Sequence, residues 1–227
     1  MVTVNIPGWD AHPDRVPASP SAFDEEFDGT LTGWTAINPG GNLTYDANAT
    51  IPSHLYMSLA ATVGEDTFGV YKAAPTPPFT VTAKVCGFLD FSNNGYCYQA
   101  WGIGVGEASP GRYVGIWAPN NEYTDTTTTV EFNEWTDPTT FSRSLTLAPN
   151  AEGYAMHGEW YLRLVVASAT SIASYYSPNG LLWLPRYPAY APSPAFSGGG
   201  LSVILAQIQN PPTPKGAKGA FDWVRFT

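Results

Sequence analysis

The side chains with the clearest capacity for chemistry are the two glutamates of the stretch VEFNEW, Glu131 and Glu134. Two carboxyl groups about 5 Å apart on one face can act as acid and nucleophile in the hydrolysis of a glycosidic bond. Successive side chains of a β-strand point to opposite faces, so residues an odd number of positions apart do not share a face. Because Glu131 and Glu134 are three positions apart, the stretch does not predict a hydrolytic pair.

Other reactive residue types are present but lack the spacing of known sites. His12, His54 and His157 are far apart and form no pair at helical metal-binding spacing. The stretch GEASPG does not have the spacing of a serine-nucleophile elbow. The glycines at 198–200 precede a β-like run, which predicts a turn and not a phosphate-binding loop. We therefore expect that the chain is not an enzyme.

The two cysteines are Cys86 and Cys97. Matching the apolar faces of the flanking runs pairs odd-numbered residues with odd-numbered ones, such as Val85 with Ile103, and the two cysteines then point to opposite faces. A disulfide requires Cα atoms closer than about 7 Å with converging side chains. We expect free thiols, as is typical of cytoplasmic synthesis, and the absence of a nearby histidine cluster argues against a zinc site.

A sugar-binding site needs an exposed aromatic ring that stacks on a pyranose, with amides or carboxylates nearby. In RYVGIWAP, Val114 and Ile116 are in phase, so two aromatic rings lie on the face away from the expected core. The same rings also fit the packed face of a second sheet or a subunit contact. Together with the polar and aromatic residues that follow, they make up the candidate carbohydrate-binding set: Tyr113, Trp117, Asn120, Asn121 and Tyr123.

A second aromatic surface is predicted in LLWLPRYPAYAPSPAF, where Trp183, Tyr187 and Tyr190 are interspersed with prolines. Rigid aromatic side chains lose little conformational entropy on binding, so a protein partner fits this surface at least as well as a sugar.

Residues 1–22 contain four prolines and little apolar periodicity. This composition predicts an extended N-terminal arm without a core of its own. Ile6 and Trp9 are the candidate anchors through which such an arm would bind other proteins. A free terminus fits the same segment.

About a dozen short β-like runs must position these side chains. Each run is bounded by Gly, Pro, Asn or Asp. Neither a convincing amphipathic helix nor a repeat of fixed period is evident. The pattern predicts an all-β fold, a two-sheet antiparallel jelly-roll sandwich over residues 23–227. The residues expected to face its core in the two clearest runs are Val81, Ala83 and Val85, and Trp101, Ile103 and Val105.

The composition narrows the choice of partners. With 227 residues and 44% hydrophobic residues, the chain can form one sizeable core. A formal charge of -9 opposes binding to nucleic acid. The sequence contains no apolar run of membrane-spanning length and no signal-peptide pattern at its start. We expect neither a nucleic-acid nor a membrane partner, and synthesis in a host cytoplasm.

Three stretches resemble the concanavalin A-like lectin/glucanase superfamily: FDEEFDG followed by GW, YLRLVV followed by ASYYSPNGLLW, and the closing AFDWVRF. The likeness covers residues 23–227 and implies a jelly roll whose first and last strands pair. Glucanases of this superfamily carry a Glu, apolar, Asp, apolar, Glu pattern, which is absent here. The leader HPDRVPASPSA with FDEEFDG and VGEASPG also resembles modules of tailed-phage virion proteins.

The resemblance further implies a structural calcium ion near the first and last strands. Asp24, Asp28 and Asp222 are the candidate ligands, since calcium prefers carboxylate oxygens. The same three carboxylates also fit solvated or capping positions. No other cofactor is expected.

The function expected from these features is that of a non-catalytic, virion-associated binding module. The arm would attach it to other virion proteins, as a homo-oligomer or part of a larger assembly, and the sandwich would display a carbohydrate-binding or host-surface-binding face. A structural capsid or tail decoration protein without glycan binding is the first alternative, and a glycan-active hydrolase is the second.

Overall fold

The computed structural model describes residues 20–60, 66–88, 98–108, 111–119, 130–145, 158–196, 200–210 and 217–227. These residues form two antiparallel sheets of seven strands each, and the helical structure among them is the short 3-10 turn Pro39–Gly41. The prediction of an all-β, two-sheet sandwich is confirmed. The expected arm, residues 1–22, lies almost wholly outside the described residues, so its structure stays a prediction.

One sheet, here called sheet A, has the strand order β12-β11-β10-β5-β14-β3-β2. Its central strands β5, β10 and β14 are long, and the chain's last strand lies between β5 and β3. The bounds are β2 Leu43–Ala47, β3 Leu55–Leu59, β5 Phe79–Phe88, β10 Gly158–Ser168, β11 Ser171–Ser177, β12 Leu184–Tyr190 and β14 Ala217–Phe226.

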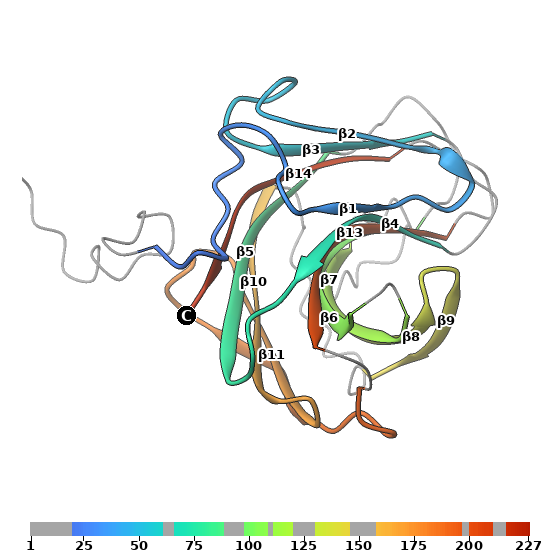
Figure 1. Ribbon diagram of the computed structural model, residues 1–227, viewed down its shortest axis with the longest axis vertical. Coiled ribbons are helices and arrows are strands. Elements are labelled where there is room, and N and C mark those ends of the chain that lie inside the picture. Colours follow the sequence, from blue (N-terminus) through green and yellow to red (C-terminus); the bar gives the residue numbers. More distant parts are fainter. Residues whose placement is uncertain are drawn as a thin grey trace, which may run out of the picture.

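The other sheet, sheet B, has the order β1-β4-β13-β6-β7-β8-β9. Figure 1 shows that sheet B is strongly curled and that sheet A wraps around its outer side. The bounds are β1 Thr35–Ile37, β4 Asp66–Ala73, β6 Tyr98–Glu107, β7 Tyr113–Pro119, β8 Glu131–Asp137, β9 Thr140–Ser144 and β13 Leu201–Asn210.

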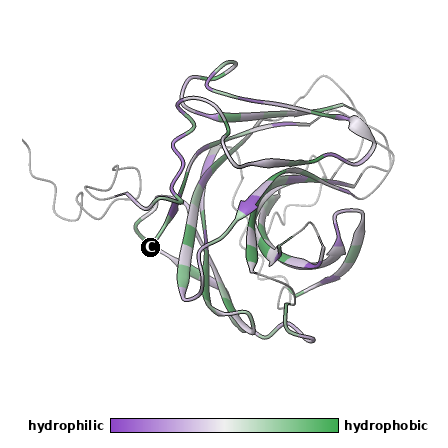
Figure 2. Cartoon of the chain, viewed as in Figure 1, coloured by the Kyte–Doolittle hydropathy of each residue, from purple (hydrophilic) through white to green (hydrophobic). Residues whose placement is uncertain are grey.

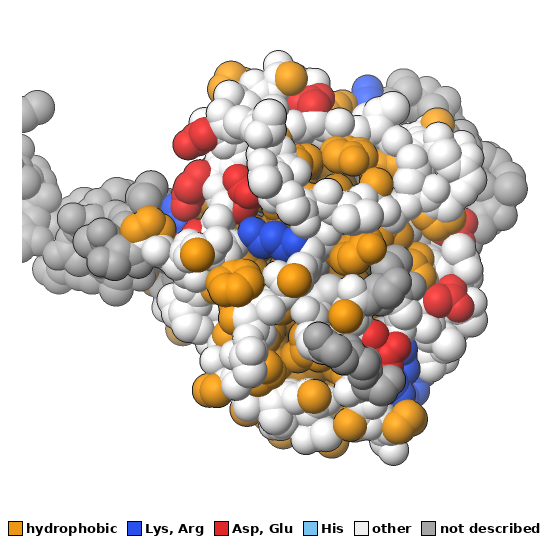
Figure 3. All heavy atoms as spheres, in the orientation of Figure 1, with side chains coloured by type: hydrophobic (Ala, Val, Ile, Leu, Met, Phe, Trp, Pro, Cys, Tyr) orange, Lys and Arg blue, Asp and Glu red, His pale blue; other side chains and the backbone are white. Residues whose placement is uncertain are grey.

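The main core lies between the two sheets. Along the strands of both sheets hydrophobic and hydrophilic residues succeed one another (Figure 2), as expected when one face of each strand is buried. Figure 3 shows hydrophobic side chains in the space between the sheets and acidic side chains mostly at the rim. All six predicted core residues are buried, which confirms the predicted strand phase: Val81, Ala83, Val85, Trp101, Ile103 and Val105.

The first described residues run beside the last strand. Glu25 and Val224 form an antiparallel bridge, with backbone hydrogen bonds of 2.9 Å in both directions. Next to it, the Asp24 carboxylate accepts a hydrogen bond from the Phe226 amide at 2.6 Å. The segment expected to form the first strand thus meets the last strand in an isolated bridge, whereas the first strand of the structure, β1, pairs with β4.

The described part of the chain contains no helix that is both long and apolar enough to cross a lipid bilayer.

Candidate functional site

The inner curve of sheet B, here called the inner face, carries a second set of buried side chains. In β7, Val114 and Ile116 point toward sheet A and belong to the main core, whereas Tyr113 and Trp117 point the other way. They form a separate buried cluster with Trp135 and several aliphatic residues of neighbouring strands. The inner face therefore brings together aromatic side chains from β7 and β8.

Glycines make room for two of these rings. A Cβ atom on Gly102 would lie 2.7 Å from the indole carbon Cε3 of Trp117, and one on Gly115 would lie 2.4 Å from Cζ2 of the same ring. On Gly106 it would lie 2.3 Å from Cβ of Tyr113. Because such contacts are too short for real atoms, larger residues would displace Tyr113 and Trp117. The alternating glycines of GIGVG and the single glycine of RYVGIW are the sequence signal of this packing, here called the glycine floor.

The rings continue as a ladder toward the edge strand β9. Tyr113 and Trp135 are stacked, with centroids 6.0 Å apart and an angle of 4° between their planes. Phe141 meets Trp135 edge to face at 5.4 Å and is 36% exposed. Such pairs contribute about 0.5–1.5 kcal/mol each beyond the burial of area. The ladder therefore runs from a buried ring to one that reaches solvent.

The curl of sheet B brings the turn between β8 and β9 against the start of β4. The Thr67 amide donates a hydrogen bond to the Pro138 carbonyl at 2.8 Å. The hydroxyls of Thr67 and Tyr113 also share a hydrogen bond. Since β13, β6 and β7 separate β4 from β8 in the sheet order, these contacts close the sheet onto itself.

Three buried polar atoms of the inner face have no hydrogen-bond partner among the described residues: the indole nitrogens Nε1 of Trp117 and Trp135, and the amide oxygen Oδ1 of Asn133. The Asn133 nitrogen Nδ2 donates to Glu131 Oε2 at 2.9 Å, which fixes the orientation of the amide. Buried polar groups are almost always hydrogen-bonded, and an unpaired one costs about 1–3 kcal/mol. Two donors and one acceptor are thus unpaired, although all three atoms are buried in this structure.

Carboxylates gather at the closure of the sheet. Burial, together with the charge of Asp137, raises the pKa of Asp66. The pKa of Asp137 is lowered, mainly because the amide and the hydroxyl of Thr139 donate hydrogen bonds to it. Burial raises the pKa of Tyr113 well above its usual value. The closure therefore holds two carboxylates that repel each other beside a neutral phenol.

The predicted carbohydrate-binding set is only partly placed by the structure. Tyr113 and Trp117 lie on the predicted face, but both are 0% exposed, so the expectation of open rings is wrong and the packed alternative is observed. The strand phase could not reveal this, because the burial results from the curl of the whole sheet. Asn120, Asn121 and Tyr123 lie outside the described residues.

Sequence reasoning missed Asn133, Trp135 and Phe141. The signal for the first two was present, because Glu131, Asn133 and Trp135 occupy alternate positions of VEFNEW and therefore share one face of a strand. Phe141 carries no such signal, since all five residues of β9 are exposed and its contact with Trp135 depends on the hairpin.

The two glutamates of β8 point to opposite faces, as the spacing predicts. Glu131 accepts a hydrogen bond from Asn133 on the inner face. Glu134 is in phase with Phe132, which packs in the main core, and its carboxylate pairs with Arg143 at 2.8 Å. An acid and nucleophile pair is therefore not formed by these residues.

The predicted aromatic partner surface is mostly packed against the protein itself. Trp183 is half-buried beneath the Arg163 guanidinium, with Cζ 3.6 Å from the ring centroid. Tyr187 stacks on Phe132 at 5.6 Å, and Tyr190 is buried in the main core. The expectation of three exposed rings is thus wrong for Tyr190.

The apolar side chains that do reach solvent at this end of sheet A are Leu181, 56% exposed, and Leu182, 61% exposed. They lie in the turn between β11 and β12, where Asn179 Oδ1 accepts hydrogen bonds from both of their amides at 3.0 Å. The other predicted anchors, Ile6 and Trp9, lie outside the described residues.

The three candidate calcium ligands do not come together. Both carboxylate oxygens of Asp24 accept backbone hydrogen bonds, from Ser21 and Phe226. Asp28 is exposed, and Asp222 forms an ion pair with Lys84. No group of three or more His, Cys, Asp or Glu side chains suited to a metal ion occurs within the described ranges. The capping alternative is therefore the one observed for Asp24.

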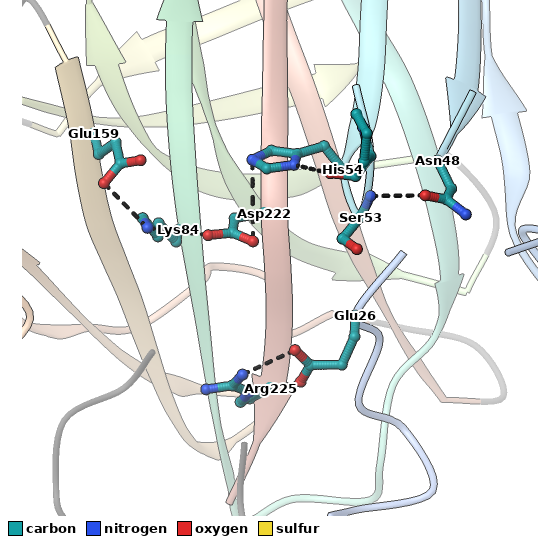
Figure 4. A network of polar contacts seen from close by, with 9 residues as sticks. Glu26, Asn48, Ser53, His54, Lys84, Glu159, Asp222 and Arg225 are labelled. Carbon is teal, nitrogen blue, oxygen red and sulfur yellow. Dashed lines mark hydrogen bonds and ion pairs between the residues drawn. The ribbon is translucent and has the colours of Figure 1, made fainter. Parts of the chain in front are cut away.

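The outer face of sheet A carries a polar network (Figure 4). Lys84 is almost fully buried and its Nζ lies 3.0 Å from the carboxylates of both Glu159 and Asp222, while His54 lies 4.0 Å from Asp222. The two carboxylates compensate the charge of Lys84, which explains how a lysine can be buried on a sheet surface.

Cys86 lies beside the same network. It is a free thiol, as predicted, and Cys97 lies outside the described residues. Burial, with a contribution from the charge of Glu159, raises the pKa of Cys86. The raised pKa favours the protonated thiol, which is the less nucleophilic form.

Known proteins share this architecture without close sequence similarity. No protein-family model matches the chain, and a search of curated proteins found no match. Among solved structures, the GH43 BlXynB protein from Bacillus licheniformis is similar with a TM-score of 0.59 and 16% identity over 89% of this chain. The chain spans only 38% of the length of that protein.

Two smaller proteins match over nearly their whole length. The CBM2 module of Lactobacillus casei BL23 phage J-1 evolved Dit is similar with a TM-score of 0.52 and 9% identity, covering 91% of this chain and 94% of the module. The Lotus tetragonolobus seed lectin has a TM-score of 0.51 and 8% identity, covering 90% and 96%. These likenesses show that the chain has the concanavalin A-like jelly-roll fold, and that phage and lectin modules share it.

Proposed function

We propose that this chain is a non-catalytic carbohydrate-binding module of a virion surface, and that the inner face of sheet B is its glycan site. The observation that carries the proposal is the meeting of the Tyr113 and Trp135 rings with unpaired polar atoms of Trp117, Trp135 and Asn133. A sugar offers both an apolar face that stacks on rings and hydroxyls that donate and accept hydrogen bonds. The inner face carries the matching groups, which are buried in the closed form that the structure shows.

The absence of catalysis is supported by the two glutamates of β8. A retaining hydrolase needs two carboxyl groups about 5–5.5 Å apart on one face. Glu131 points into the inner face, whereas Glu134 points away from it and pairs with Arg143. We therefore expect no hydrolysis of bound glycans, and detection of released sugar from a panel of polysaccharides would overturn this part of the proposal.

A virion location is supported by the likeness in fold to a module of phage J-1 Dit. The N-terminal arm would attach the chain to other virion proteins. Deletion of residues 1–22 is expected to abolish association with the particle while leaving glycan binding intact.

A glycan array with two matched variants tests the binding site. Phe141, at the exposed end of the ladder, and Tyr45, on β2 of the other sheet, are 36% and 39% exposed. We expect Phe141→Ala to weaken retention at least tenfold, which corresponds to about 1.4 kcal/mol, and Tyr45→Ala to leave it unchanged. Failure of the unmodified chain to bind any glycan, or equal losses in both variants, would refute the proposed site.

A structural decoration protein is the second candidate, and the exposure of Leu181 and Leu182 favours it. Two leucines held outward by Asn179 form an apolar projection that is suited to a contact with a neighbouring protein. Under this alternative, Leu181→Ser combined with Leu182→Ser would release the chain from the particle, and no glycan would be retained.

A further inference from the structure

The inner face is closed in the structure, and the contacts that close it come from one hairpin. The tip of this hairpin, residues 135–141, includes Pro138, whose carbonyl accepts the hydrogen bond from Thr67. On the inner side, the Tyr113 ring lies between Trp135 of the hairpin and the Thr67 hydroxyl of β4. A sugar ring therefore cannot reach Tyr113 unless the tip moves.

The hairpin has the features of a movable element attached to a fixed base. At its base, Phe132 packs against Tyr187 and Tyr190 of sheet A, and its carbonyl accepts a hydrogen bond from the Leu145 amide at 2.8 Å. The pairing of β8 with β9 is irregular on both sides of Trp135. The tip therefore begins where the regular ladder of the base ends.

Apart from Trp135, the tip is weakly held in its closed position. Trp135 is fully buried, whereas residues 136–141 are exposed or half-buried and contribute little buried surface. At the point of closure, Asp66 lies near the like-charged Asp137. Local openings have low free energy where buried contacts are few and backbone hydrogen bonds lie near solvent. The repulsion between the two carboxylates lowers that free energy further.

We propose that residues 135–141 form a flap that lifts from β4 to admit a glycan between the Tyr113 and Trp135 rings. This inference rests on the proposed function and adds that the glycan site is gated. Lifting the tip separates Trp135 from Tyr113, so that a sugar ring can enter between the two aromatic rings. A glycan that binds only the open form shifts the population toward it, and its apparent affinity is reduced by the small fraction of open molecules.

Hydrogen exchange of the unmodified chain without any glycan tests the flap directly. The Thr67 amide bonds to the flap, whereas Phe68 and Val70 of the same strand pair with β13. We expect the Thr67 amide to exchange at least tenfold faster than the amides of Phe68 and Val70. Equal protection of the three amides would overturn the flap, whatever the outcome of glycan binding.

A reversible cross-link then tests the gate. In a variant with Asp66→Cys and Asp137→Cys, a disulfide would tie the tip to β4, and its formation is checked by mass. We expect the oxidised variant to lose glycan retention at least tenfold and the reduced variant to recover it.

The two proposals fail in different ways in this experiment. Equal binding by the oxidised and reduced variants would refute the gate and leave the glycan site standing. No binding by the unmodified chain would refute the glycan site, and the gate with it, while the exchange of Thr67 alone decides whether the tip opens.

Discussion

The indole of Trp117 lies so close to Gly115 that a Cβ atom on the glycine would come within 2.4 Å of ring carbon Cζ2. The Gly115→Ala variant must therefore displace a fully buried ring. Overpacking of this kind costs about 1–3 kcal/mol. We expect a lower free energy of unfolding by about that amount, measured by denaturant titration.

Gly29 is the matched control for this prediction. A Cβ atom on Gly29 would meet nothing within 4 Å, so Gly29→Ala is expected to change the free energy of unfolding by less than about 0.5 kcal/mol. Similar losses in both variants would mean that Trp117 does not rest on a glycine floor.

Removing the charge of Asp66 is expected to stabilise the protein in a pH-dependent way. Its pKa in the folded state is raised above the ordinary value of 3.8 by burial and by Asp137. Its contribution to stability is thus fully present below pH 3.8 and is lost as the pH rises through the raised pKa. Asp66→Asn avoids this loss, so we expect a higher Tm than the parent at pH 7. At pH 3 the advantage should disappear, and a constant difference at both values would contradict the assignment.

Breaking the ion pair of Arg225 with Glu26 is expected to lower the free energy of unfolding. The Arg225 side chain is 7% exposed, and its guanidinium donates to both Glu26 oxygens, at 2.8 and 2.9 Å (Figure 4). Because Glu26→Ala removes this partner from a buried cation, we expect a loss of about 1–3 kcal/mol in denaturant titration. Asp28→Ala, at an exposed carboxylate in the same segment, is the control, and its change in the free energy of unfolding should be near zero.

The titration of the Cys86 thiol can be measured from the pH dependence of its alkylation. Its pKa is raised above the ordinary value of 9.0, chiefly by burial and also by the charges of Glu159 and Asp222. In a Cys97→Ser background, the rate of alkylation should rise with pH through a midpoint above 9.0. Asp222→Asn is expected to lower that midpoint, and a midpoint at or below 9.0 in the parent would refute the buried environment.

Much of the fold could be predicted because strands carry a local signal. The alternation of Val81, Ala83 and Val85 with polar residues was sufficient to identify their buried face. The same rule separated Glu131 from Glu134 and so argued against a hydrolytic pair. These conclusions need only the period of two within a strand.

The candidate site could not be predicted to the same depth, because its closure joins distant parts of the chain. Tyr113 and Trp117 were assigned to the correct face, but their burial depends on the curl of a seven-stranded sheet. The contact of Thr67 with Pro138 and the unpaired state of the Asn133 oxygen have no local pattern in the sequence. Such features emerge only when the register and curvature of several strands are known.

The bridge between Glu25 and Val224 has a mechanical consequence. The described chain enters and leaves the sandwich at the same corner (Figure 1). The Phe23 and Phe226 rings are 5.9 Å apart there. Tension applied through both of these segments would peel them apart one hydrogen bond at a time, without shearing a whole strand. The ion pair of Arg225 with Glu26 lies next to this bridge and would be the first side-chain contact to resist the force. The force would not act on the inner face of sheet B.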